Sequence, residues 1–233
     1  MSLNKISQIL FKLIFSDFII FRLFLDFLTY LLISVVIFSG SEFNGNISEW
    51  NVSNVTDMKG MFRGAKKFNR PLNNWNVSNV TQMIGMFEYC GNFNQPLNNW
   101  NVSRVTDMYG MFYNATAFNQ PIVNWNVGAV TNMTYMFRNA TAFNQPLNTW
   151  DVSNVTNMTN TFARCDFNSD ISEWNVSNVT NMEKMFSGVK KDNLNISNWD
   201  VSNVINMERM FRYCVSFNQP LDKWNTKNVL KMT

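Results

Sequence analysis

Few residues of this 233-residue sequence are of the types that do chemistry, and none of them is a histidine. The chain therefore lacks the usual base of hydrolytic triads and the commonest zinc ligand. Lysines, arginines and carboxylates remain, so catalysis is disfavoured without being excluded. The sequence contains no G-x-S-x-G, P-loop or G-x-G-x-x-G motif. We expect no enzyme activity, no cofactor and no metal ion.

Three cysteines are the first candidates for a chemical site. Each cysteine lies the same number of residues after a tryptophan, at Cys90, Cys165 and Cys214. In the other repeats this position holds alanine or valine. A position that accepts only small apolar residues is typical of a core, and the cysteine count is odd. We therefore predict buried free thiols at this position, and neither a disulfide framework nor a metal centre.

Two further motifs admit a functional and a structural interpretation. Asp166, Asp170 and Glu173 carry the oxygen ligands that Ca²⁺ prefers, but their spacing fits a solvated turn better. Asn-x-Ser/Thr triplets, such as those at Asn76 and Asn79, would accept glycans in a eukaryotic secretory pathway. They recur because the string N-V-S-N-V-T recurs, and asparagine and serine are common turn residues. We assign both motifs to turns.

A row of asparagines and aspartates is the remaining candidate. One such residue follows every tryptophan; the members of this Asn/Asp row are Asn51, Asn76, Asn101, Asn126, Asp151, Asn175, Asp200 and Asn225. On a strand, these side chains would form a polar ladder along an exposed face. Two interpretations stay open, namely amides that stack for structural reasons and a surface that binds a protein. We carry the row forward as the candidate protein-binding face.

The spacing of the tryptophans indicates the repeat units that must position the candidate residues. The tryptophans recur at one constant spacing, which is a single residue shorter only between Trp150 and Trp174; the positions are Trp50, Trp75, Trp100, Trp125, Trp150, Trp174, Trp199 and Trp224. A fixed period of this length is typical of a repeat solenoid, in which each unit buries its apolar face against the next. The excess of tryptophan and methionine is therefore one unit copied about eight times.

The apolar spacing predicts two short elements in each unit. The segment Trp75–Ser78 alternates apolar and polar residues, which predicts a strand with its tryptophan and valine inward and its asparagine outward. Apolar residues then recur at steps of 3, 3, 1 and 3 over Val80–Cys90. This spacing predicts one face of a short helix, capped at Ser78 or Asn79.

The unit V-T-D-M-x-x-M-F-x-x-A-x-x-F-N-x-P-L-x-x-W-N-V-S-N, found from about Phe43 to Met232, resembles the BspA-like leucine-rich repeats of bacterial surface proteins. The resemblance implies a leucine-rich-repeat-like solenoid, with short parallel strands on one face and short helices or turns on the other. It also implies an adhesion-type role, in which a host or extracellular protein is the partner.

A separate apolar segment, residues 1–41, precedes the repeat domain at residues 42–233. Its longest uncharged run, Phe27–Ser41, is shorter than the roughly 20 residues that span a bilayer. Three interpretations stay open: a signal peptide, an uncleaved membrane anchor, and a helix that caps the first repeat. We favour membrane targeting.

Charge and repetition together limit the function classes. The net charge is +3 and no basic block accompanies it, so we expect no nucleic-acid partner. We predict a non-enzymatic solenoid that binds proteins and is exported to the cell surface or anchored in a membrane. The alternative is an intracellular interaction scaffold, for example in a large virus, with the N-terminal helix as a cap.

Overall fold

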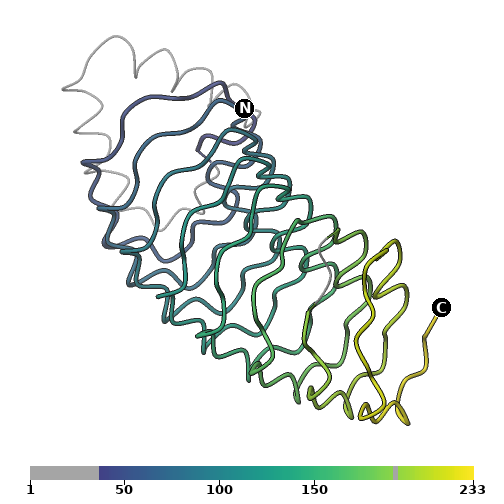
Figure 1. The fold of residues 1–233 in the computed structure, drawn as a ribbon. Coiled ribbons are helices and arrows are strands. Elements are labelled where there is room, and N and C mark those ends of the chain that lie inside the picture. Colours follow the sequence, from purple (N-terminus) through teal and green to yellow (C-terminus); the bar gives the residue numbers. More distant parts are fainter. Residues whose placement is uncertain (1–36, 191–193) are drawn as a thin grey trace, which may run out of the picture.

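The computed structural model describes residues 37–190 and 194–233, which form a coil with one turn of chain for each repeat (Figure 1). Neighbouring turns are joined by isolated parallel β-bridges between equivalent residues of successive units. The bridged residues are Asp57, Gln82, Asp107, Asn132, Asn157, Asn181, Asn206 and Lys231, in that order. The described residues contain no helix and no strand longer than a single bridged residue. The coil runs from the purple turns at one end to the yellow turns at the other (Figure 1).

The strand predicted over Trp75–Ser78 is wrong, because the pairing lies further along the unit, at Gln82. Local turns use the amides that a parallel ladder would need. The tryptophan amide donates to the carbonyl oxygen of Leu72 (3.0 Å), and the serine amide donates to the side chain of the asparagine (3.2 Å). The predicted orientation is confirmed, since the tryptophan and the valine are buried and the asparagine is exposed.

The short helix predicted over Val80–Cys90 is also wrong. Amides in this segment bond three residues back, as from Glu88 to Gly85 (3.1 Å), and alternate amides donate to the next turn, as from Gly85 to Tyr109 (2.7 Å). Gly85 and Tyr89 have φ values of 56° and 60°, whereas a helix needs an unbroken run of right-handed residues. The apolar spacing fits both structures. The glycine at Gly85 marks the left-handed position that rules the helix out.

Three columns of stacked aromatic rings run through the core, beside buried methionines, valines and leucines. In the middle of the coil, the ring centroids of Trp100 and Trp125 lie 6.4 Å apart. Those of Phe112 and Phe137, in the second column, lie 5.7 Å apart. Phe118, in the third column, stacks on Phe112 of its own turn at 4.0 Å. Most repeats contribute one ring to each column, although the repeat that leads to Trp199 has no phenylalanine for the third. The columns are buried by stacking between neighbouring turns.

Polar residues of the repeat also join neighbouring turns. The indole N–H of Trp125 donates to the carbonyl oxygen of Leu97 in the preceding turn (3.0 Å). The amide of Asn119 donates to the side-chain oxygen of Asn94, its equivalent one unit earlier (2.9 Å). Because buried backbone groups must find partners, such bonds explain why these residue types recur in unit after unit.

The stacking begins inside the predicted N-terminal segment. The amides of Phe38 and Gly40 donate to Met61 (3.0 Å) and Arg63 (2.6 Å) of the first complete turn. The buried ring of Phe38 lies 5.5 Å from that of Phe62, so it extends one aromatic column. The rest of the segment, residues 1–36, lies outside the described residues, and so do the interpretations that concern it. In the part of the chain that the structure describes, no helix is sufficiently long and apolar to cross a bilayer.

Candidate functional site

The cysteines occupy the buried position that the spacing predicts. Cys90 and Cys165 are fully buried. Cys214 is half-buried, because only a partial turn follows it. No disulfide joins any of the three cysteines. The thiol of Cys90 donates to the carbonyl oxygen of Phe62 in the preceding turn (2.7 Å). Burial raises the pKa of Cys90 and of Cys165 to about 12, so both remain thiols at neutral pH. The prediction of buried thiols is confirmed for these two residues.

The carboxylates considered as calcium ligands lie in a turn. Asp170 accepts a hydrogen bond from the amide of Ser172 (2.9 Å), and this bond lowers the pKa of its carboxyl. Asp166 lies 4.0 Å from the ammonium of Lys190. Within residues 37–190 and 194–233, no group of three or more acidic or cysteine side chains is arranged to hold a metal ion.

All eight members of the Asn/Asp row are exposed, and each has a local structural role. Each side-chain oxygen accepts a hydrogen bond from the amide two residues later, at 3.0–3.4 Å. No hydrogen bond joins neighbouring members among the described residues, so Asx turns rather than stacked amides are the structural role of the row. At Asp151 and Asp200, hydrogen bonds from Ser153 and Ser202 lower the carboxyl pKa. The second polar atom of each side chain is not used by its turn.

A second group of side chains was not predicted from the sequence. The described residues contain five tyrosines, and each lies in the part of its unit between the first methionine and the following alanine or cysteine. Four of the five fall in three consecutive turns. Their ring centroids lie 5.1 Å apart for Tyr89 and Tyr113, 5.4 Å for Tyr109 and Tyr135, and 5.9 Å for Tyr113 and Tyr135. The guanidinium carbon of Arg138 lies 5.3 Å from the ring centres of both Tyr113 and Tyr135. We name these four tyrosines and Arg138 the tyrosine–arginine cluster.

The backbone of this face is left-handed at two positions of the unit, one shortly after its first methionine and one shortly after the following phenylalanine. Glycine fills them at Gly60, Gly64, Gly85, Gly110 and Gly188, and residues with side chains fill them at Tyr89, Asn114, Tyr135, Asn139, Asn160, Arg164, Lys184, Arg209 and Tyr213. A side chain in this conformation costs about 1–2 kcal/mol, which glycine avoids. The conformation recurs at these two positions in successive turns, so it belongs to the backbone path of the repeat, which the bonds between turns impose.

We expect the variant Lys184→Gly to raise the free energy of unfolding by about 0.5–1 kcal/mol, because glycine relieves the left-handed strain at a φ of 54°. Glu183→Gly is the control, since either substitution removes the Glu183–Lys184 ion pair, and this one also removes the hydrogen bond that Glu183 accepts from Asn206 (3.3 Å). Glu183 has no positive φ, so its replacement should lower that free energy by a similar amount. Urea unfolding of both variants measures the difference, and a loss of stability in Lys184→Gly would contradict the assignment of strain.

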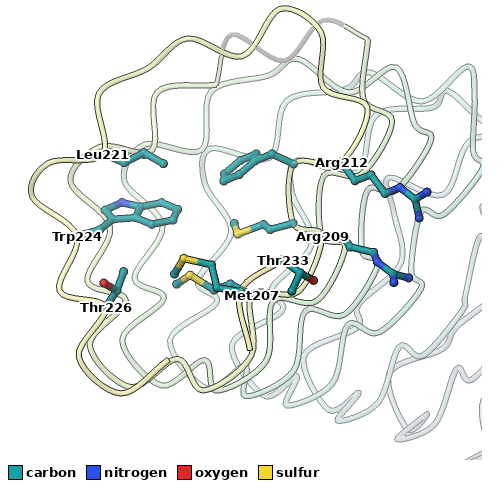
Figure 2. Close-up of a pocket in the computed structure, with 10 residues that line it drawn as sticks. Met207, Arg209, Arg212, Leu221, Trp224, Thr226 and Thr233 are labelled. Carbon is teal, nitrogen blue, oxygen red and sulfur yellow. The ribbon is translucent and has the colours of Figure 1, made fainter. Parts of the chain in front are cut away.

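A hollow of about 690 Å³ lies at the C-terminal end of the coil (Figure 2). Leu221, Trp224 and Met207 line it, while the charged ends of Arg209 and Arg212 point away from it (Figure 2). In the earlier turns, the next repeat covers the equivalent side chains. The hollow is therefore the open end of the core.

The comparisons with known proteins agree with the repeat. Two stretches of the chain, residues 33–150 and 139–233, match the model of a family described as "Mycoplasma protein of unknown function, DUF285". No curated protein and no solved structure matches the chain. Because the two matched stretches cover most of the sequence, the chain belongs to the DUF285 repeat family.

Proposed function

We propose that this chain is a non-enzymatic, leucine-rich-repeat-like solenoid that presents an extended surface to a protein partner. The observation that carries the proposal is the arrangement of exposed side chains in rows, one residue per turn, along a continuous stack of turns. Protein partners bind over broad surfaces of about 800 Å² on each side, and rows that cross several turns suit such a contact.

The Asn/Asp row is the proposed contact face. Its side chains are exposed and are held in one orientation by their Asx turns. A side chain that is already ordered loses less conformational entropy when a partner binds. The polar atom that each turn leaves unused is available to a donor or an acceptor of the partner.

The cell surface is the proposed location, and the division into an apolar segment, residues 1–41, and a repeat domain is part of the same proposal. Its support is the apolar composition of that segment together with the resemblance of the repeat to BspA-like surface proteins. An intracellular scaffold is the alternative that the experiment must distinguish.

The test combines surface labelling with site-specific crosslinking of the full chain in the cells that make it. A membrane-impermeant lysine reagent should label the protein on intact cells. A photoreactive amino acid at Asn101 should crosslink it to one discrete protein. Full protection from the reagent would contradict the surface location, and the absence of any crosslinked protein from sites in several turns would contradict the interaction role.

Variants then test the face. The double variant Asn101→Asp/Asn126→Asp keeps the Asx turns, because Asp151 makes the same bond, but adds two negative charges. We expect about tenfold weaker binding of the crosslinked partner. The control Thr116→Asp/Thr141→Asp adds the same charge at exposed positions outside the row and should bind normally. Equal affinity of the two variants would place the contact elsewhere.

A further inference from the structure

The guanidinium of Arg138 lies against two aromatic rings that stack on each other. The guanidinium carbon lies 5.3 Å from the ring centres of Tyr113 and Tyr135, which belong to adjacent turns. Stacking on aromatic faces orients a guanidinium and leaves the N–H groups at its edge directed outward. A long side chain that would otherwise sample many rotamers is thus positioned before any ligand binds.

This guanidinium has no acidic partner. Arg138 makes no ion pair among the described residues. The carboxylates on this face of the preceding turns are already engaged. Glu88 pairs with Arg63 at 2.9 Å, and Asp107 accepts hydrogen bonds from the amide of Tyr109 (2.8 Å) and the side chain of Asn132 (3.3 Å). The positive charge of Arg138 is therefore uncompensated.

The same turn holds two buried polar atoms without a partner. In the part of the chain that the structure describes, only Thr134 Oγ1 and Arg138 Nε are buried side-chain polar atoms that make no hydrogen bond. Thr134 is only 7% exposed. Native proteins rarely leave such groups unsatisfied, so an ordered water or a ligand group completes the hydrogen bonding of this turn.

The tyrosines around this turn offer contact area and donors. Tyr89 and Tyr109 are 42% and 37% exposed, whereas most aromatic side chains of the described residues are buried. A hydrogen bond with the Tyr113 side chain is the main cause that raises the pKa of Tyr89. Tyrosine and arginine are enriched among the residues that dominate the affinity of protein interfaces.

We propose that the tyrosine–arginine cluster binds an acidic peptide segment of a partner protein, and that a carboxylate of this segment pairs with Arg138. The carboxylate accepts two parallel N–H bonds from the guanidinium fork, and the tyrosine rings pack against the adjoining residues of the segment. A nucleic acid needs a stripe of basic side chains along its phosphates, whereas the cluster contains a single guanidinium beside four tyrosine rings, which suits one carboxylate of a peptide better. The inference rests on the proposed function, in that it supplies a site for the same protein partner.

The experiment titrates the full chain with a fluorescein-labelled oligoglutamate of about eight residues, which is long enough to cross several turns spaced about 4.8 Å apart. Fluorescence polarisation at physiological salt gives the Kd. We expect Arg138→Gln to weaken binding about tenfold. Arg138→Lys keeps the charge without the planar fork and should restore only part of the affinity.

Arg104→Gln is the matched control. Arg104 is exposed, lies away from the cluster, and donates to Asn79 Oδ1 (3.0 Å), so the variant loses the same charge without touching the site. It should bind the peptide as the unaltered protein does. An equal loss in Arg104→Gln and Arg138→Gln would reduce the interaction to net charge and overturn the proposal. Tighter Arg138-dependent binding of a DNA oligonucleotide than of oligoglutamate would also overturn it.

A second measurement separates this inference from the proposed function. Binding of the crosslinked cellular partner to Arg138→Gln should be about tenfold weaker than to the unaltered chain. Undiminished binding would refute the cluster as the contact and leave the proposed function intact. If no cellular partner crosslinks to any site, the proposed function fails, while the oligoglutamate titration still decides whether the cluster binds carboxylates.

Discussion

Replacement of Trp125 by alanine is expected to lower the free energy of unfolding by about 3–5 kcal/mol. Trp125 is 2% exposed, and its ring stacks between those of Trp100 and Trp150 at 6.4 Å on either side. The variant also loses the indole hydrogen bond to Leu97. Each turn is stabilised only by its neighbours, so a cavity in the middle of the coil weakens the contacts on both sides.

The control for this prediction is Trp224→Ala at the C-terminal end of the coil. Trp224 makes the same kind of indole bond, to Ile196 at 3.0 Å, but it is half-buried and lines the open hollow. Its replacement should cost clearly less. Guanidinium unfolding followed by circular dichroism measures both variants, and the Trp125 variant should also show a broadened transition as the two halves uncouple. Equal losses would show that the central column does not hold the turns together.

Cys90 and Cys165 are expected to react with a thiol reagent at pH 8 at least about a thousandfold more slowly than ordinary thiols, because burial excludes the reagent and also raises the pKa. The thiolate is the reactive form, and burial raises the pKa of both residues from 9.0 to about 12. Their thiolate fraction at pH 8 therefore falls by about three powers of ten.

A chromogenic disulfide reagent measures these rates on native and denatured protein. The half-buried Cys214 supplies the fast phase, which the variant Cys214→Ser should abolish. In denaturant, all three thiols should react at one rate. Three equal rates in the native protein would mean that the position shared by the cysteines is open to solvent, contrary to its burial in the structure.

Spacing in the sequence is sufficient to predict the period and the core, but not the path of the backbone. Tryptophans that recur at one spacing must face inward in every unit or outward in every unit. Because the ring is apolar, burial in every unit is favoured. The apolar steps over Val80–Cys90 fit both a helix and a series of tight turns. Only the left-handed positions at Gly85 and Tyr89 distinguish them, and a backbone angle is not visible in an apolar pattern.

The two candidate surfaces differ in how visible they are in the sequence. The Asn/Asp row is evident because it repeats, and repetition is also why its Asx-turn role could be anticipated at Asn76 and its equivalents. The tyrosine–arginine cluster combines residues from several different positions of the unit, and no single position repeats the tyrosine in successive units. The confinement of the described tyrosines to one stretch of the unit was the signal in the sequence.

The directional bonding between turns has a consequence for how such a protein changes its length. At every junction between complete turns, hydrogen bonds run in two directions. The amide of Phe87 and its equivalents donate to the next turn, whereas the amide of Thr106 and its equivalents donate to the preceding turn. Any turn therefore presents to its neighbours the same donors and acceptors as any other. Gene duplication or deletion of whole units preserves every junction, and the shortened unit before Trp174 still stacks Phe167 on Phe143 at 6.3 Å. Length can thus evolve by recombination between units, while the side chains of a few turns diverge to recognise a partner.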